Sequence, residues 1–281
     1  MAGAVSGWRE ALRLSARLQP TLPLQDLLRD ATYYAEQGYA VSDSEAALLR
    51  EKQAELATNP AFMAAYAGAD SLVAHGDIRR NPALGRTLRQ LAEQGLDSFY
   101  TGPLAQALCA DLAESGSPLR LEDFAGHRAT LTSPLHTTIR GSTLYNTPPP
   151  TQGVASLAIL KIFDDLPAED AESFAHIHGL VEATKKAFLF RNAHVGDPAY
   201  MTECAQSFLN DTQQIKQLAR AINMHEAMPW PAPSQQGDTT WMGATAASGV
   251  AVSMTQSLYL EFGSGRFLPQ TGLSWHTRGS P

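Results

Sequence analysis

The sequence predicts a mixed fold in which helices and antiparallel strands occupy separate parts of the chain. Residues 7–57 and 81–118 carry apolar residues at helical spacing, and Gly or Pro closes each run. Residues 121–150 alternate and are rich in Thr, and the stretch from residue 239 reads as strand, tight turn and strand. Because the helices and strands do not alternate as βαβ units, a parallel sheet is not expected.

The composition is that of an ordinary globular protein. Its 281 residues are 44% hydrophobic, which suits one large domain or two small ones. The net charge of −7 argues against nucleic acid or an anionic membrane as the main partner. No apolar run reaches the roughly 18 residues that span a bilayer, so no membrane span is expected. The N-terminus lacks the pattern of a secretory signal, which slightly favours cytoplasmic over periplasmic residence, and the compartment stays open because the native N-terminus is expected to be missing.

Start and stop signals bound the expected N-terminal helices. Ser6 is the expected N-cap of the first helix, and the second, "PLQDLLRDATYYAEQG", ends at Gly38. The third has Ser or Asp at its start, in "SDSEAALLREKQAELATNP", and stops before Pro60. Gly95 ends the helix in "NPALGRTLRQLAEQG", and a further helix follows in "GPLAQALCADLAESG".

The middle of the chain changes from strands to helices. The stretch "LEDFAGHRATLTSPLHTTIRGSTLYNTPPP" at 121–150 predicts two strands with a turn. Two apolar helices are expected in 151–166 and 171–198, then a polar helix over 206–225 and an exposed linker over 226–238. The apolar face of the second of these helices is expected to contain Ile177, Leu180, Val181, Ala187 and Phe188.

The last segment predicts a hairpin. In "TTWMGAT-AASG-VAVSMTQSLYLEFGSG" two apolar strands flank a turn in which Gly249 stands where a positive φ is needed. His176 and His178 are two residues apart on a predicted helix, so their side chains point to different faces and do not share a metal. Neither HExxH, G-x-S-x-G nor a phosphate-binding loop is present, so no metal and no cofactor is expected.

Thr239, in "GDTTW", is the one residue that could supply a complete catalytic unit. An N-terminal Thr has its Oγ as nucleophile and its own α-amine, which ordinarily has a pKa of about 8, as base. In an uncut chain that nitrogen is an amide and cannot act as a base. A flexible linker precedes Thr239 and a strand follows, so the bond before it is open to cleavage. On pattern alone, an ordinary strand-initiating Thr is the commoner reading.

Several ordered segments resemble one family. They are "AGAVSGWREA", "FYTGPLAQALCADL", "LEDFAGHRATLTSPLHTTIRG", "YNTPPPTQGVASLAIL", "HGLVEATKKAFLFRNAHVGDP" and "GDTTWMGATAASGVAVSMTQSLYLEFGSG". Together they span nearly the whole chain and are similar to the gamma-glutamyltranspeptidase family of N-terminal-nucleophile hydrolases. The resemblance implies a four-layer αββα sandwich of the α+β class.

The resemblance also implies how such a chain matures. Family precursors cut themselves at the bond that corresponds to Asp238–Thr239. Residues 1–238 would then be the large subunit and residues 239–281 the start of the small subunit. Thr239 would attack the carbonyl of a small-molecule amide, and water or an acceptor amine would resolve the acyl-enzyme. Ser257 matches a second threonine that supports the nucleophile, and serine keeps the hydroxyl that this role needs.

Two departures from the family pattern bear on the substrate. Tyr259 stands in place of a substrate-binding asparagine, and Arg278 falls where the family has a glutamine near the substrate's amino group. Because arginine repels an ammonium and pairs with carboxylates, an altered acyl specificity is expected. The segments "QSLYLEFGSG", "LPQTGLSW" and "HTRG" resemble a divergent, acylase-like branch of the family. Gamma-glutamyl transfer or hydrolysis, an acylase for glutaryl-type amides, and a non-catalytic homologue therefore all stay open.

Relative to the family pattern the chain is expected to lack segments at both ends. The first would carry a substrate-binding arginine, and the second would carry the rest of the small subunit with its oxyanion-binding elements. The 281-residue chain is therefore expected to be an incomplete sandwich that is inactive on its own.

Overall fold

The computed structural model divides the chain into two compact units. Unit 1 combines residues 1–129 with 235–281, and unit 2 comprises residues 130–234. No helix among the described residues is long and apolar enough to cross a membrane. The structure describes residues 2–18, 20–68, 72–168, 170–230 and 238–277.

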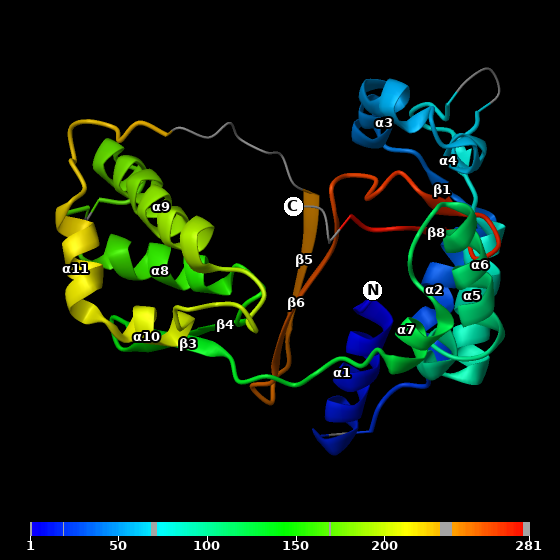
Figure 1. The fold of residues 1–281 in the computed structure, drawn as a ribbon, viewed down its shortest axis with the longest axis horizontal. Coiled ribbons are helices and arrows are strands. Elements are labelled where there is room, and N and C mark those ends of the chain that lie inside the picture. The colour runs from blue at the N-terminus through cyan, green and yellow to red at the C-terminus, as the bar shows by residue number, and fades with distance from the viewer. Residues whose placement is uncertain (1, 19, 69–71, 169, 231–237, 278–281) are drawn as a thin grey trace. The chain divides into compact units, whose positions relative to one another are not determined.

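Unit 1 is mainly helical (Figure 1). Its helices are α1 (Ala4–Leu18), α2 (Leu24–Gln37), α3 (Asp43–Leu56), α4 (Pro60–Ala65), α5 (Pro82–Gln94), the 3-10 turn η1 (Leu96–Phe99), α6 (Pro103–Glu114) and α7 (Leu121–Gly126). Its antiparallel strand pairs are β1 (Tyr39–Ala40) with β2 (Ile78–Arg79), β5 (Asp238–Thr245) with β6 (Ala251–Tyr259), and β7 (Phe267–Leu268) with β8 (Leu273–Ser274).

Local signals set most helix ends in unit 1. The Ser42 hydroxyl accepts the Glu45 N–H at 3.1 Å, and Gly38 and Gly95 follow α2 and α5 with positive φ, as predicted. The prediction for Ser6 is wrong, because α1 already begins at Ala4. Ser6 is fully buried, and its hydroxyl accepts the Ala129 N–H at 2.8 Å.

The expected strand at the start of 121–150 is also wrong in part. Residues Leu121–Gly126 form α7, because the Asp123 carboxylate accepts the Arg120 N–H at 2.7 Å and closes the first helical turn. The predicted strand pair itself is confirmed further along, as β3 (Leu135–Ile139) and β4 (Ser142–Asn146).

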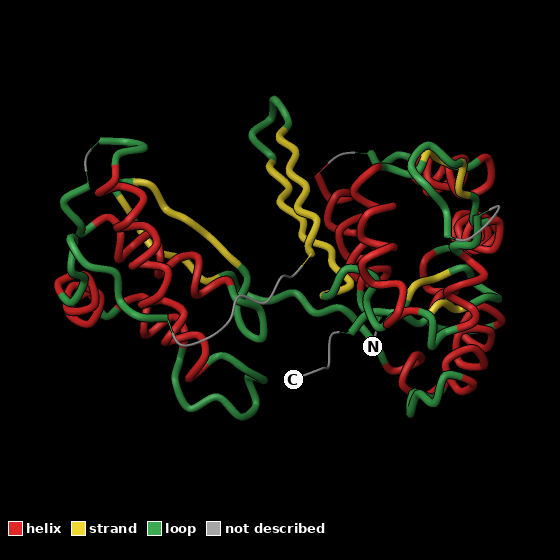
Figure 2. The backbone as a smooth tube through the Cα atoms, turned by 90° about the horizontal axis from the view of Figure 1, so that it is seen from above, coloured by secondary structure: helices red, strands yellow, loops and turns green. Residues whose placement is uncertain are grey.

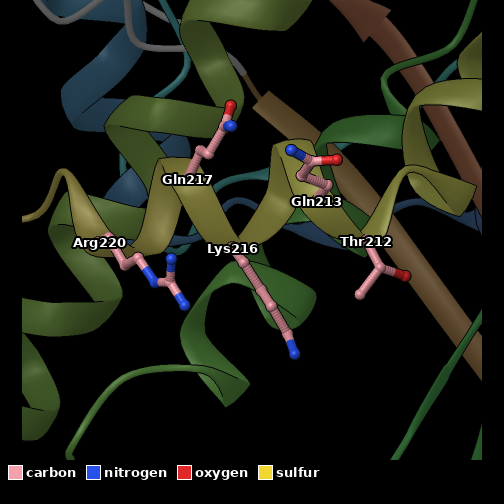
Figure 3. A pocket seen from close by; sticks show the side chains of 5 residues that line it. All are labelled: Thr212, Gln213, Lys216, Gln217 and Arg220. Carbon is pink, nitrogen blue, oxygen red and sulfur yellow. The ribbon is translucent and has the colours of Figure 1, made fainter.

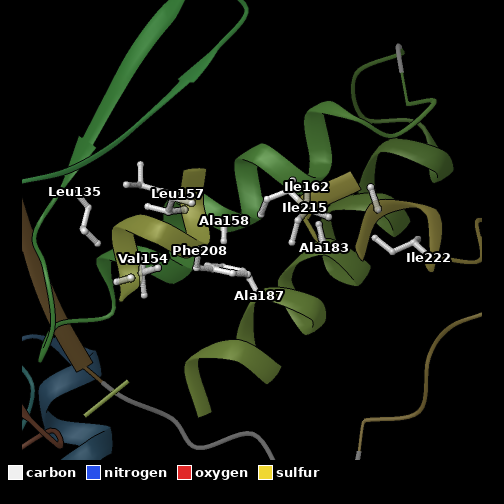
Figure 4. Packing of buried hydrophobic residues seen from close by; sticks show 13 residues of the cluster. Leu135, Val154, Leu157, Ala158, Ile162, Ala183, Ala187, Phe208, Ile215 and Ile222 are labelled. Atoms are coloured by element: carbon white, nitrogen blue, oxygen red, sulfur yellow. The ribbon is translucent and has the colours of Figure 1, made fainter. Parts of the chain in front are cut away.

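Unit 2 packs helices around one apolar cluster. Besides β3 and β4 it contains α8 (Gly153–Asp164), α9 (Phe174–His194), α10 (Ala205–Asn210) and α11 (Thr212–Arg220). Figure 4 shows Leu157, Ala158 and Ile162 of α8 beside Ala183 and Ala187 of α9 in this cluster. The predicted polar helix over 206–225 is instead two short helices. Asp211 is the single residue between α10 and α11, and its carboxylate accepts the Gln214 N–H at 2.9 Å and caps the start of α11.

The buried face of α9 matches the predicted one at Ala187, which is fully buried, and differs from it elsewhere. Ile177 and Val181 are 52% and 47% exposed, whereas Glu182 is 1% exposed. Glu182 is stabilised there by Lys185, whose Nζ donates to its carboxylate at 2.6 Å. The same pair binds both backbone groups of Met228: Glu182 accepts its N–H at 3.2 Å, and Lys185 donates to its carbonyl at 2.6 Å. The ion pair therefore attaches the segment that follows α11 to α9.

Replacing Lys185 with Met is expected to destabilise unit 2 by about 3 kcal/mol, because the Glu182 carboxylate would stay buried without a cation. The double variant Glu182→Gln with Lys185→Met should recover part of that loss. Urea unfolding of the single and double variants measures both effects. Lys186→Met is the matched control, because the Lys186 ammonium contacts the Met228 sulfur at 3.5 Å and not a carboxylate. Equal midpoints for Lys185→Met and Lys186→Met would contradict the assignment.

Candidate functional site

The hairpin that carries Thr239 is regular over most of its length. Pairing between β5 and β6 is continuous from Thr245↔Ala251 to Thr240↔Gln256 (Figures 1 and 2). The predicted turn is confirmed: Gly249 has a φ of +86° and donates its N–H to the Ala246 carbonyl at 2.9 Å. Every residue from 239 to 250 is exposed, so the hairpin's own ladder and turn supply its local order.

The register shifts by one residue at the base of the hairpin. After Thr240↔Gln256 the next pair is Asp238↔Tyr259. Thr239 therefore lies opposite two residues of β6, Ser257 and Leu258, in a β-bulge. Bulges re-aim side chains and are over-represented next to active sites. The structure thus brings Thr239, Ser257 and Tyr259 together within one short stretch of ladder.

Hydrogen bonds hold the bulged strand on two sides. The Tyr259 N–H donates to Ser257 Oγ at 2.8 Å. The carbonyl of Leu258, in the middle of the bulge, accepts the Thr277 N–H at 3.0 Å and the Thr277 hydroxyl at 3.3 Å. The segment after β8 therefore returns to the bulge that faces Thr239.

The other two predicted site residues, Asp238 and Arg278, lie at the start and just beyond the end of the range 238–277 that the structure describes. The backbone of Asp238 opens β5 and pairs with Tyr259. Arg278 lies outside the described residues, directly after Thr277. Most of the predicted linker 226–238 lies outside them as well.

Residues 262–275, called here the docking segment, are attached to the helices of unit 1. The side chains that bind its backbone, over sequence separations of 159 to 206 residues, are Asn59 on Gly265 at 2.7 Å, Asn81 on Gly272 at 2.8 Å, Thr87 on Thr271 at 2.8 Å, and Asp111 on Gln270 at 3.0 Å. Asp111 is 3% exposed and also accepts the Gln270 side-chain amide at 2.8 Å. Phe267 and Leu268 are buried in two different apolar clusters of unit 1.

Sequence reasoning missed this attachment, although part of its signal is visible. Asn-Pro at 59–60 and at 81–82 marks a helix start, and each Asn Oδ1 does accept a helical N–H at 3.1 Å. The same two side chains use Nδ2 to hold the docking segment. The Asn-Pro motif predicts the helix cap, but it does not predict that the same side chain binds a distant segment.

A surface hollow on unit 2 is not a candidate active site. Its volume is about 410 Å³, and it is lined by Thr212, Gln213, Lys216, Gln217 and Arg220. All five belong to α11, and Figure 3 shows their side chains diverging from that one helix. The described residues also contain no group of three His, Cys, Asp or Glu side chains that could hold a metal ion.

Comparison with known proteins identifies the family. The gamma-glutamyltranspeptidase family model matches residues 1–281. The chain belongs to the gamma-glutamyltranspeptidase family. Curated relatives include the oxamate amidohydrolase proenzyme of Klebsiella pneumoniae, 45% identical over 100% of this chain and 53% of that protein. The glutathione hydrolase-like YwrD proenzyme of Bacillus subtilis is 34% identical over 99% of this chain and 52% of its own length.

A solved structure at 27% identity confirms the fold class. The cephalosporin acylase from Bacillus halodurans superimposes with a TM-score of 0.83 at 27% identity, covering 98% of this chain and 51% of that one. The predicted α+β fold of N-terminal-nucleophile type is therefore right. The chain spans about half the length of these relatives.

Replacing Asp111 with Ala is expected to loosen the docking segment, because the backbone N–H and the side-chain amide of Gln270 would both lose the buried carboxylate that accepts from them. The expected loss of stability is about 3 kcal/mol. Amide hydrogen exchange should become faster at residues 267–273, which report on the segment directly. Glu114→Ala, at an exposed position of the same helix, is the matched control. Unchanged exchange in the Asp111 variant would show that the segment is held by its apolar contacts alone.

Proposed function

We propose that this chain is the part of a gamma-glutamyltranspeptidase-family amidase that contains the self-cleavage site and the nucleophile, Thr239. The observation that carries the proposal is the bulge, which sets Thr239 opposite Ser257. The names of its relatives support it, since several are proenzymes. The subunits would be residues 1–238 and 239–281 as far as this chain extends.

Self-cleavage would use the hydroxyl before the amine exists. Thr239 Oγ adds to the carbonyl carbon of Asp238, the Asp238–Thr239 C–N bond breaks, and the nitrogen takes the hydroxyl proton. Water then hydrolyses the resulting ester, which leaves a carboxyl group on Asp238 and a free amine on Thr239. An α-amine ordinarily has a pKa of about 8, so this one can accept the Thr239 hydroxyl proton in later turnovers.

Turnover would repeat the chemistry on a small-molecule amide. Thr239 Oγ attacks the substrate carbonyl, the C–N bond breaks, and the amine leaves with the proton that the α-amine had taken. Water resolves the acyl-enzyme, releases the acid and restores the hydroxyl. Ser257 would donate a hydrogen bond to the nucleophile's oxygen and stabilise the charge that develops there.

The substrate class we favour is an amide whose acyl part ends in a carboxylate. Arg278 would bind that carboxylate, because a guanidinium pairs with a carboxylate in bidentate geometry. The relative at 45% identity is named for oxamate, a small amide with an adjacent carboxylate. Gamma-glutamyl amides are the second candidate, because glutathione hydrolases also match along most of this chain, at 26% identity for the Escherichia coli enzyme.

Protein expressed from the complete gene is expected to appear as two bands on a denaturing gel, and the N-terminal sequence of the smaller should begin Thr-Thr-Trp-Met-Gly. Thr239→Ala should give one uncut band. Ammonia release from oxamate, beside hydrolysis of gamma-glutamyl and glutaryl anilides, then ranks the substrates. A wild-type chain that stays in one piece and turns over none of the three would support the non-catalytic reading.

Replacing Ser257 with Ala is expected to slow cleavage and turnover by about 10- to 100-fold, the range for one lost hydrogen bond to a charged group. Ser257→Thr keeps the hydroxyl and should stay close to the wild-type rate. Thr255→Ala, at an exposed position on the same strand, controls for effects on the ladder. If Ser257→Ala cleaves as fast as Thr255→Ala, the supporting role of Ser257 is excluded.

A further inference from the structure

Tyr259 has a backbone conformation that a bulky residue rarely adopts. Its φ is +85°, in the left-handed region where a non-glycine residue carries a cost of about 1–2 kcal/mol. Elsewhere in the described chain, Arg140 and Glu172 also have positive φ. Arg140 lies in the turn between β3 and β4, and Glu172 precedes α9. Tyr259 differs because it ends a strand, at the bulge that faces Thr239.

The peptide group between Leu258 and Tyr259 is bound at both of its ends. Its carbonyl accepts two hydrogen bonds from Thr277, and its N–H donates to Ser257 Oγ. The plane of this peptide is thereby fixed, and the chain must still leave the ladder toward the turn at 260–263. The positive φ of Tyr259 absorbs that change of direction.

The alternative with a negative φ requires the same peptide to turn over. Rotation of one peptide plane changes ψ of the residue before it and φ of the residue after it in opposite senses. Bringing Tyr259 to an ordinary φ in this way would turn its N–H away from Ser257 and the Leu258 carbonyl away from Thr277. The left-handed conformation at 259 and the bonds to Ser257 therefore form or break together.

The bond from Tyr259 also limits what the Ser257 hydroxyl can do. A serine oxygen has two lone pairs and one proton. When a backbone N–H occupies one lone pair, the proton is restricted to the remaining directions around the oxygen. Thr239 lies opposite Ser257 across the bulge.

We propose that position 259 is a positioning residue that acts through its backbone: its left-handed conformation keeps the 258–259 peptide turned so that Ser257 presents its hydroxyl proton to Thr239. The proposal rests on the function proposed above. On this proposal, the residue at 259 must above all tolerate a positive φ. Any residue that does so is expected to keep the 258–259 peptide and Ser257 in place, regardless of its side chain.

The test compares substitutions at 259 that differ in backbone preference, in protein from the complete gene. Tyr259→Gly and Tyr259→Asn tolerate positive φ and should cleave themselves at a rate equal to or above wild type. Tyr259→Val, which is β-branched, should be slower by about 5- to 30-fold. Tyr259→Phe controls for the phenol hydroxyl. Self-cleavage is measured because it needs no substrate, which separates the backbone effect from binding by the side chain.

Two results would overturn the proposal. Equal loss in the Gly and Val variants would mean that the side chain carries the effect, and a Val variant as fast as wild type would mean that the peptide orientation does not matter. If wild type itself stays uncut, the proposed function fails and amide exchange still decides the backbone claim. The Tyr259 and Thr277 amides should be protected in wild type and Gly and lose protection in Val, and equal protection in all three would overturn it.

Discussion

The attachment of the docking segment to the helices is the constraint on which unit 1 depends. A chain segment that is buried must find partners for its backbone groups, and this one has little sheet of its own to supply them. Side chains at the starts of α4 and α5 and within α5 and α6 provide them. Phe267 and Leu268 add apolar contacts in two clusters. Hydrogen bonds and apolar contacts therefore hold the same short docking segment.

This attachment also connects one end of the hairpin to the helices of unit 1. Thr277 follows the docking segment and binds the Leu258 carbonyl, so the base of the hairpin is connected to the anchored part of unit 1. The other end, around Gly249, has its own turn bonds and is exposed. Thr239 and Ser257 lie at the connected end. The residues proposed for catalysis are therefore those whose backbone geometry the helices can influence.

The sequence predicted what local chemistry controls. Rules for helix caps and tight turns correctly predict the cap at Ser42, the helix ends at Gly38 and Gly95, and the turn at Gly249. The errors at α7 and at the break before α11 come from local caps by Asp123 and Asp211, whereas the error at α9 arose where a tertiary contact outweighs a local pattern. Glu182 is buried because Lys185 and Met228 satisfy it, so the face of α9 cannot be read from apolar spacing.

The candidate site also combines features that the sequence predicts with features that only the folded chain shows. Thr239 and Ser257 could be named from the family resemblance, whereas their register could not, because strand alternation alone predicts a regular ladder. The 258–259 peptide in the bulge makes three hydrogen bonds, and two of them come from Thr277, some twenty residues away in the sequence. The tertiary role of Asn59 and Asn81 was hidden for a related reason, since the capping pattern already accounts for an asparagine at those positions.

The position of the bulge has a consequence for maturation. From Thr240 onward both strands of the hairpin lie on the same side of the proposed cut, so those pairs would survive it unchanged. In this ladder only the Asp238↔Tyr259 pair joins the two sides. The bonds from Asn59, Asn81, Thr87 and Asp111 cross from one product to the other without depending on the cut bond. Cleavage before Thr239 would thus free the Thr239 amine and break up only the Asp238↔Tyr259 pair of this ladder. The two products would stay together, because other hydrogen bonds join them.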